Sequence, residues 1–154
     1  YGLRRQHSQR IIDKKGASRL MPEILEKGAA LGFIADQDAG RKGVFVDFFG
    51  RKASTYKSIA LLAVTENMPI VIGVCRQHFG EFFFEIECGD AIMPEDWAEK
   101  EDPIGWVSQK YTSEMERLIR KDPRQYWWLH RRWKSRPKGE AKTAATANIS
   151  YSRK

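Results

Sequence analysis

The residues best suited to chemistry are two carboxylates one residue apart, in the segment Asp36-Gln37-Asp38. They follow an apolar run, residues 29–35, and would stand at the carboxyl end of a buried strand, where open α/β sheets place ligands. Such a pair could bind a metal ion, act as a base and its helper, or orient a cation. The alternative is a surface turn whose Asp side chains accept hydrogen bonds from local backbone amides. Because no His or Cys stands nearby at metal-ligand spacing, we expect no metal site.

Three histidines could serve as general bases: His7, His78 and His130. None stands in a recognisable arrangement with Ser or Cys, so we interpret all three as structural. Cys75 and Cys88 lie in apolar segments, which predicts free thiols packed in the core.

Basic and aromatic side chains are mixed between residues 117 and 138. This stretch has nine basic residues and one acidic residue, a net charge of +8 in a chain whose net charge is +7. It also contains three tryptophans, Trp127, Trp128 and Trp133. Such a mixture suits an anionic partner with an apolar or stacking surface, either a nucleic acid or the phosphorylated headgroups of a membrane. The plainer alternative is a solvated basic helix end.

The hydrophobic pattern predicts three helices. The first covers residues 17–27, with Ser18 as its N-cap, a late start because of Pro22, and Gly28 as its stop. The second runs from a cap at Ser54 or Thr55 to about Asn67. The third begins at Asp102-Pro103 and ends at Asp122-Pro123.

The strands are predicted from apolar runs. Residues 29–35 and 69–75 do not alternate, which is typical of strands buried on both faces. Because a helix lies between them, they indicate a βαβ unit with parallel neighbours. Residues 44–49 are a further apolar piece. Residues 82–88 alternate as a strand with one wet face, entered by a hairpin turn at residues 78–81. We expect an α/β fold with a mixed, largely parallel sheet and flanking helices.

Length and composition limit the class of protein. A chain of 154 residues with 42% hydrophobic residues suits one folded domain and excludes global disorder. No run of 18 apolar residues is present, so we expect no membrane-spanning helix. The first residue is Tyr1, which suggests a processed protein or a piece of a longer one. Residues 140–154 are small and polar and are predicted to be a disordered tail.

Two long motifs resemble the lipid A late acyltransferases, the lauroyl- and myristoyltransferases of lipopolysaccharide assembly. The first motif is ADQDAG (35–40), GVFVDFFG (43–50) and AST (53–55), and the second is DPRQYWWLHRRWK (122–134) with RP (136–137). The likeness runs from about residue 3 to residue 139. It implies a glycerolipid-acyltransferase-like fold, incomplete at the N-terminus, in which residues 1–139 are the C-terminal part of a single acyltransferase domain.

The resemblance implies an enzyme on the cytoplasmic face of the inner membrane. It would move a fatty acyl chain from acyl carrier protein, a thioester co-substrate with no other cofactor, to a hydroxyl of the anionic lipid A precursor. In the family a His-x-x-x-x-acid motif deprotonates that hydroxyl. Here the fifth residues after the three histidines are Ile12, Phe83 and Ser135. We therefore expect the catalytic pair and a membrane anchor to lie upstream of this chain, and the chain alone to be inactive.

The resemblance also assigns site residues. Arg5 falls on an essential arginine of the family, with Arg4 as the alternative, and Asp36 falls on an essential aspartate. Arg5 would hold a phosphate or the developing oxyanion, and Asp36 would orient that arginine or a substrate group. From their charge and position rather than from the resemblance, Arg131, Arg132 and Lys134 are expected to contact lipid phosphates. Asp38 is a further expected substrate-binding residue. The expected membrane-interface residues are Trp127, Trp128 and Trp133, although the first two could instead pack on the 103–121 helix.

Two other functions stay open. The charge of residues 117–138 would permit a nucleic-acid-binding module, but the sequence has no known reader motif, so we expect no nucleic-acid partner. An acyltransferase acting on another glycolipid, such as a phosphatidylinositol mannoside, would share the general pattern.

Overall fold

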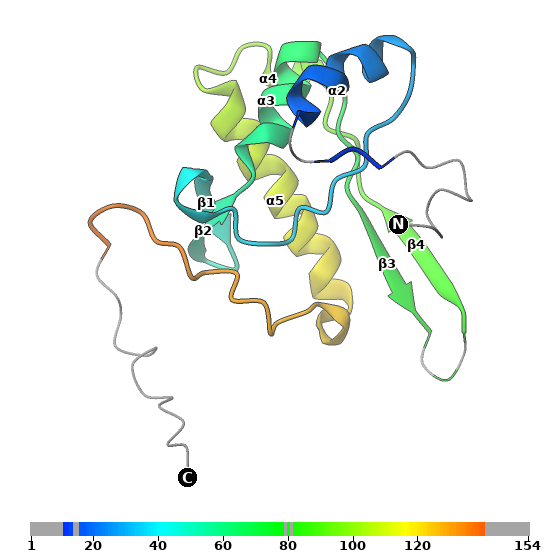
Figure 1. Cartoon of the computed structure of the whole chain (residues 1–154). Coiled ribbons are helices and arrows are strands. Elements are labelled where there is room, and N and C mark those ends of the chain that lie inside the picture. The colour runs from blue at the N-terminus through cyan, green and yellow to red at the C-terminus, as the bar shows by residue number, and fades with distance from the viewer. Residues whose placement is uncertain (1–10, 14–15, 79, 81, 141–154) are drawn as a thin grey trace. The chain divides into compact units, whose positions relative to one another are not determined.

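The structure is a computed structural model that describes residues 11–13, 16–78, 80 and 82–140 (Figure 1). Arg4, Arg5 and His7 lie outside the described residues, as does almost all of the predicted tail. The chain divides into two units, residues 1–34 and 35–154, which are described separately.

The first unit contains the helix α2 (Ala17–Glu26), close to the predicted range. It starts after Gly16, whose φ is 88°, rather than at a Ser18 cap. Gly28 follows its end with a φ of 74°, which confirms the predicted glycine stop. The predicted late start is wrong, because Pro22 lies inside the helix. At this position proline lacks the N–H that would bond to the preceding turn.

The segment of residues 29–35 is irregular, so the predicted buried strand is wrong. Phe33 and Ile34 are 44% and 72% exposed. A strand needs a neighbour to satisfy its backbone, and none of the described residues pairs with this segment. The expected βαβ unit is therefore absent from the described part of the chain.

The described strands form two antiparallel hairpins, so the prediction of a largely parallel sheet is wrong. The mixture of helices and strands is confirmed. The hairpins pair β1 (Val44–Phe48) with β2 (Arg51–Thr55), and β3 (Gly73–Gln77) with β4 (Phe84–Cys88). The apolar run at residues 69–75 is confirmed as a strand only at its end, where residues 73–75 form the start of β3. Before it, Ile70 forms an isolated bridge to Ile92, and Val71 is 57% exposed.

The turn between β1 and β2 consists of Phe49 and Gly50, which have φ angles of 51° and 72°. Two residues of positive φ match the twist of a tight hairpin. A positive φ is uncommon for phenylalanine, and contacts with the long helix after the second hairpin hold it there. The Phe49 N–H donates to Glu116 Oε2 (2.6 Å), and the Arg120 guanidinium lies 4.7 Å from its ring centre.

Of the two helices predicted in the second unit, one starts at its predicted cap and the other does not. The helices described in this unit are α3 (Lys57–Glu66), α4 (Pro94–Trp97) and α5 (Pro103–Lys121), with single 3-10 turns η1 (Gly40–Lys42) and η2 (Pro123–Gln125). The start of α5 is confirmed, because the Asp102 carboxylate accepts a hydrogen bond from the Gly105 N–H (2.9 Å). α3 starts later than predicted, because Ser54 and Thr55 belong to β2. None of the described helices is long and apolar enough to cross a membrane.

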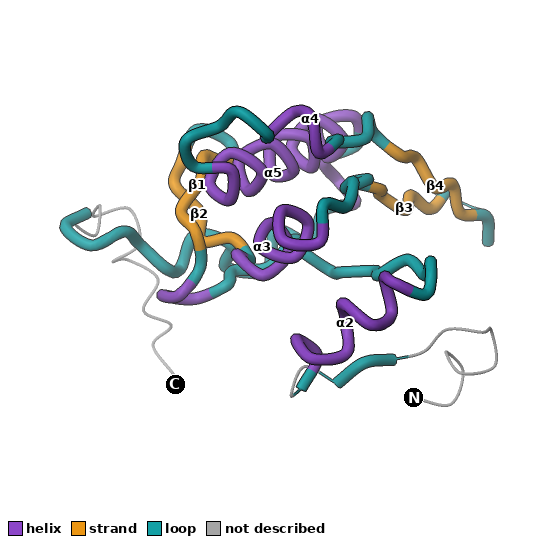
Figure 2. The backbone as a smooth tube through the Cα atoms, turned by 90° about the horizontal axis from the view of Figure 1, so that it is seen from above, coloured by secondary structure: helices purple, strands orange, loops and turns teal. Residues whose placement is uncertain are grey.

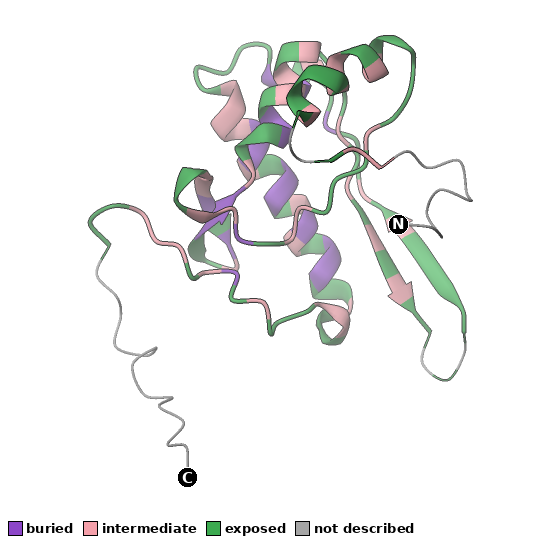
Figure 3. Cartoon of the chain, in the orientation of Figure 1, coloured by how far each residue is buried: buried purple, intermediate pink, exposed green. Residues whose placement is uncertain are grey.

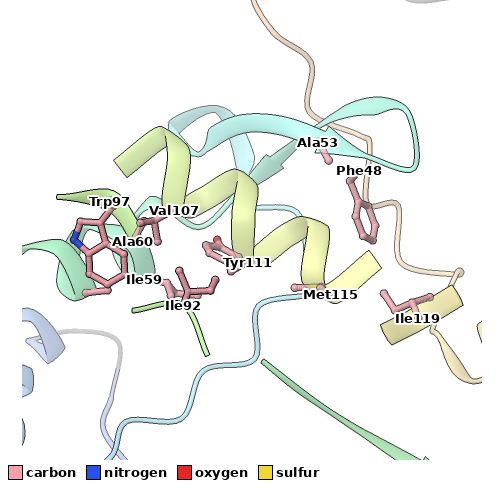
Figure 4. Close-up of a cluster of buried hydrophobic side chains, with 11 residues drawn as sticks. Phe48, Ala53, Ile59, Ala60, Ile92, Trp97, Val107, Tyr111, Met115 and Ile119 are labelled. Atoms are coloured by element: carbon pink, nitrogen blue, oxygen red, sulfur yellow. The ribbon is translucent and has the colours of Figure 1, made fainter. Parts of the chain in front are cut away.

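The core lies along one face of α5, as its spacing predicts (Figures 3 and 4). Val107, Tyr111, Met115 and Leu118 are buried on this face. Side chains from three other regions pack in the same core: Phe48 and Ala53 from the first hairpin, Ile59, Ala60 and Ala63 from α3, and Ile92 and Trp97 near α4. The two hairpins lie on either side of α5 (Figures 1 and 2).

The second hairpin is attached to α5 by charged groups. Arg76 donates to the Leu118 carbonyl (3.0 Å) and to Glu87 (2.5 Å), and Lys121 also pairs with Glu87. The predicted hairpin turn is confirmed, since the His78 N–H donates to the Phe83 carbonyl (2.9 Å).

The face of this hairpin that carries Phe84 and Ile86 is exposed, whereas its apolar residues predicted a buried face. Phe84 and Ile86 are 47% and 74% exposed, and Cys75 and Cys88 are exposed free cysteines (Figure 3). The expected packing of both thiols in the core is therefore wrong. The sequence pattern identified an apolar strand face but could not show whether another element covers it.

Candidate functional site

The candidate site is built on the loop Asp36-Gln37-Asp38-Ala39, which rests against β2. The Ala39 N–H donates to the Ser54 carbonyl (3.1 Å), and the Ser54 hydroxyl donates to the Gly40 carbonyl. A close approach at Gly43 permits this packing, because a Cβ there would lie 2.7 Å from the Thr55 carbonyl and 2.9 Å from the Ala39 Cβ. The backbone of β2 thus sets the position of the carboxylates.

Asp38 is the centre of a hydrogen-bond network, and its side chain is fully buried. Its carboxylate accepts from the Gly40 N–H (3.0 Å), from the Ser135 hydroxyl (3.0 Å) and from the Ser135 N–H (3.3 Å). Lys134 Nζ lies 3.8 Å from the same carboxylate. The Asp38 N–H donates to His130 Nε2 (2.9 Å). The carboxylate therefore joins Lys134 and Ser135 to the loop, and the backbone N–H joins His130 to it. The bond from the Gly40 N–H is the local turn that the sequence left as an alternative.

The carboxylate of Asp36, unlike that of Asp38, has a buried oxygen that accepts no hydrogen bond from the described residues. Its Oδ1 is buried and has no hydrogen-bond partner within the described part of the chain. Its backbone carbonyl accepts a hydrogen bond from the Tyr126 hydroxyl (3.0 Å). Burying a carboxylate oxygen without a partner is unfavourable, so this oxygen is suited to accept a hydrogen bond from a ligand or another side chain.

Arg132 points into the protein rather than to its surface. It is fully buried, and its guanidinium donates to the Ser54 carbonyl and to Thr55 Oγ1 (2.6 Å). It also lies 5.3 Å from the ring centre of Phe48. These contacts join β2 to the closing segment, residues 126–135, from inside the protein.

Two tyrosine hydroxyls donate hydrogen bonds near this arginine. The Tyr111 hydroxyl donates to the Tyr56 carbonyl (3.0 Å), and burial raises the pKa of Tyr111 far above its ordinary value. Burial likewise raises the pKa of Tyr126 to about 12. Burial lowers the pKa of Arg132, while the tyrosines and the Asp38 and Asp36 carboxylates favour its charged form. Both tyrosines therefore remain protonated donors at neutral pH.

The aromatic residues of the closing segment point in two directions. Trp127 and Trp128 are 64% and 45% exposed, and the next residue, Leu129, is 85% exposed. Trp133 is partly buried, stacks on Phe48 (centroids 5.6 Å apart) and donates from Nε1 to the Phe48 carbonyl (3.2 Å). The ring of Trp128 packs edge-on against Phe49, with centroids 5.4 Å apart. Of the three tryptophans predicted to lie at a membrane interface, Trp127 and Trp128 are therefore exposed and Trp133 is not.

The structure brings together a subset of the predicted site residues: Asp36, Asp38, Arg132 and Lys134. Arg131 is exposed, and Arg5 lies outside the described residues. The sequence interpretation missed the roles of Tyr126, His130 and Ser135. The sequence gives no signal for these roles, because exposed and inward-facing residues alternate at 129–132 in the structure while Leu-His-Arg-Arg does not alternate in polarity. Among the described residues, no group of three or more His, Cys, Asp or Glu could hold a metal ion.

Comparison with known proteins places both site segments in one family. Residues 2–135 match the family model described as bacterial lipid A biosynthesis acyltransferase. The lipid A biosynthesis lauroyltransferase of Escherichia coli K12 is 27% identical over 138 residues, which are 88% of this chain and 44% of that protein. The lipid A biosynthesis palmitoleoyltransferase of the same strain and a lipid A biosynthesis acyltransferase of Shigella flexneri are each 30% identical over 144 residues, 89% of this chain and 44% of theirs.

The chain thus spans less than half the length of these curated relatives. The matched range includes the Asp36–Asp38 loop and the segment of residues 126–135 that holds it. On this match over most of its length, the chain belongs to the bacterial lipid A biosynthesis acyltransferase family.

Proposed function

We propose that this chain forms part of an enzyme that transfers a fatty acyl chain from acyl carrier protein to a hydroxyl of a lipid A precursor, on the cytoplasmic face of the inner membrane. The family match over residues 2–135 carries the proposal. The Asp36 carboxylate supports it, because its buried Oδ1 is without a partner among the described residues. Tyr126 and His130, from one distant segment, hold its loop in place.

The chemistry would be a direct transfer. The acceptor oxygen forms a bond to the thioester carbonyl carbon, the carbon–sulfur bond breaks, and the thiol of the carrier leaves with the proton of the hydroxyl. Asp36 would act by orienting a cation such as Arg5 or a polar group of the acceptor. No histidine of this chain is followed at the family spacing by an acid, so the base would come from residues beyond this sequence.

The role of Asp36 can be tested in a family-length enzyme that contains these residues. We expect Asp36→Ala to abolish acyl transfer without changing the melting temperature by more than a few degrees, because Oδ1 has no partner among the described residues. Glu99→Ala, at an exposed position, is the matched control and should retain full activity. Near-normal turnover of the Asp36 variant would remove this residue from the active site.

We also propose that the exposed part of the closing segment contacts anionic lipid. Trp127, Trp128 and Leu129 offer apolar surface, and the exposed cations Arg131 and Lys134 stand beside them in sequence. Aromatic rings next to cations are typical of surfaces that bind at the headgroup level of a membrane. Because Arg132 and Trp133 face inward, we assign this contact to the five outward residues alone.

Vesicle binding tests this surface. The double variant Arg131→Ala with Trp127→Ala should bind vesicles rich in anionic lipid about tenfold more weakly, since each cation near the surface is worth about 1 kcal/mol. Lys57→Ala, an exposed cation at the start of α3, should bind as the unmodified chain does. Salt-sensitive binding to DNA at least as tight as binding to vesicles would favour the nucleic-acid function instead.

A further inference from the structure

The loop that carries Asp36 forms no ladder with any strand in the described part of the chain, and two ring side chains, of Tyr126 and His130, hold it. The Tyr126 hydroxyl donates to the Asp36 carbonyl, across 90 residues of sequence. His130 Nε2 accepts from the Asp38 N–H, across 92 residues. These two contacts hold the backbone on either side of Gln37, which is itself exposed.

The direction of the histidine contact defines its proton. A ring nitrogen that accepts a hydrogen bond carries no proton, so the contact requires His130 to have its proton on Nδ1. In this state Nε2 is occupied by the backbone and is not available to take a proton from a substrate. The contact is therefore suited to holding the loop rather than to acid–base chemistry.

The carboxylate of Asp36 depends on this backbone support. Its Oδ1 has no hydrogen-bond partner in the described regions, so no bond at that oxygen orients the side chain. The position of the carboxylate then follows from the position of its own peptide unit, which Tyr126 holds directly and His130 holds through the next residues. The Asp38 carboxylate adds a further link between the loop and the closing segment, because it accepts hydrogen bonds from Ser135.

We propose that His130 and Tyr126 are positioning residues that set the Asp36 carboxylate for acyl transfer, an inference that rests on the proposed function of Asp36. Neither ring touches the reacting atoms. Each acts through the backbone of the loop, and the closing segment thereby becomes part of the active site without supplying a catalytic group.

The first test is spectroscopic and needs no activity. In the full chain, nitrogen-15 spectra of the imidazole should show His130 with its proton on Nδ1. His130→Phe removes the acceptor, and the Asp38 amide should then exchange with solvent about fivefold faster, as expected for one lost hydrogen bond. His130→Gln offers an oxygen acceptor near the place of Nε2 and should restore protection. A proton on Nε2, or unchanged exchange in His130→Phe, overturns the inference.

Two controls separate the local effect from general loosening. His78→Phe changes an exposed histidine of the second hairpin and should leave the Asp38 amide protected. The amides of buried α5 residues, such as Val107, should exchange at the same rate in all variants. Faster exchange throughout α5 in His130→Phe would show a purely structural role and contradict the proposal.

The second test measures transfer in a family-length enzyme. Tyr126→Phe and His130→Phe should each lower kcat about fivefold or more with little change in KM, and His130→Gln should recover most of the loss. A kcat equal to that of the unmodified enzyme in Tyr126→Phe and His130→Phe contradicts the positioning role. A loss in His130→Gln as large as that in His130→Phe contradicts it as well. If Asp36→Ala retains activity, the proposed function of Asp36 fails by itself, whatever the imidazole spectra show.

Discussion

At the scale of single residues, Arg132 differs most from what its sequence neighbourhood suggested. It directly follows the exposed Arg131 in a basic stretch, yet its guanidinium binds the end of β2 from inside the protein. Burial of a cation is costly unless hydrogen bonds satisfy it. The Ser54 carbonyl and Thr55 hydroxyl accept from the two terminal nitrogens of Arg132, whereas its Nε has no hydrogen-bond partner among the described residues. The same side chain covers the ring of Phe48. Its main role in this structure is therefore to hold the closing segment against the first hairpin.

Substitution of this arginine should be far more damaging than substitution of its neighbour. We expect Arg132→Ala to lower the free energy of unfolding by about 3 kcal/mol, because it leaves buried acceptors unpaired and opens a cavity. Arg131→Ala, at an exposed position, should change it by less than about 0.5 kcal/mol. Urea denaturation of the two variants checks this. Similar stability of both would show that the Arg132 contacts contribute little.

At the scale of elements, the close packing of β2 against the loop depends on Gly43. Its backbone is extended, with φ −74° and ψ 166°, so any residue could adopt this conformation. The requirement for glycine comes from space alone, since an added Cβ would collide with the Ser54 hydroxyl and lie 2.7 Å from the Thr55 carbonyl.

Addition of one methyl group at Gly43 should therefore separate these elements. We expect Gly43→Ala to cost about 1–3 kcal/mol of stability, the range for overpacking. At Gly32 a Cβ would meet nothing within 4 Å and the φ is not positive, so Gly32→Ala should be neutral or slightly stabilising. Thermal melting of both variants tests the difference. A Gly43→Ala protein as stable as the unmodified chain would mean that β2 can shift without loss.

The attachment of the second hairpin to α5 should depend on pH. Lys121 and Arg76 hold the pKa of Glu87 at about 2, below its ordinary value of 4.5. A lowered carboxyl pKa adds stability above the unfolded pKa, and this contribution is lost as the pH falls from about 4.5 toward 2. In the Glu87→Gln variant, the free energy of unfolding should therefore fall less between pH 4.5 and about 2 than it does in the unmodified chain. Glu85→Gln, on the same strand, serves as control, and an identical acid profile for both variants would contradict the assignment.

At the scale of the whole molecule, the two hairpins differ in how they are covered. The first packs on α5 and on the closing segment, which returns past β1 and β2 after α5 (Figure 1). The second has one face toward α5 and one bare face that carries Phe84, Ile86 and both cysteines. An isolated two-stranded hairpin is marginally stable, so its charged contacts with α5 matter more than they would in a larger sheet.

The exposed face predicts the reactivity of both thiols. Cys75 and Cys88 are free and exposed, so two equivalents should react with a thiol reagent such as DTNB in the native chain, at rates within about tenfold of those in denaturant. Cys75→Ser and Cys88→Ser should each remove one equivalent. Labelling that waits for global unfolding would show that this face is covered in solution.

Local signals in the sequence predicted three helices and two of their ends, although the starts of α2 and α3 differ from the predicted caps. The Asp102-Pro103 start and the glycine stop at Gly28 act within a single turn, and both ends lie where those residues predict. The pairing of strands could not be predicted in the same way. An apolar run shows that a segment prefers burial, but its partner is a matter of contacts between distant residues, and the run at residues 29–35 pairs with none of the described strands.

The sequence alone determined the family, the acidic loop and the basic aromatic segment, because each is a contiguous run of residue types with a recognisable order. Only the tertiary structure decided which side chains of the closing segment face inward. Arg131 and Arg132 are adjacent and chemically identical, yet one meets water and the other meets β2. That difference arises because the loop, β2 and residues 126–135 must satisfy one another's buried polar groups, and these partners stand up to 97 residues apart in sequence.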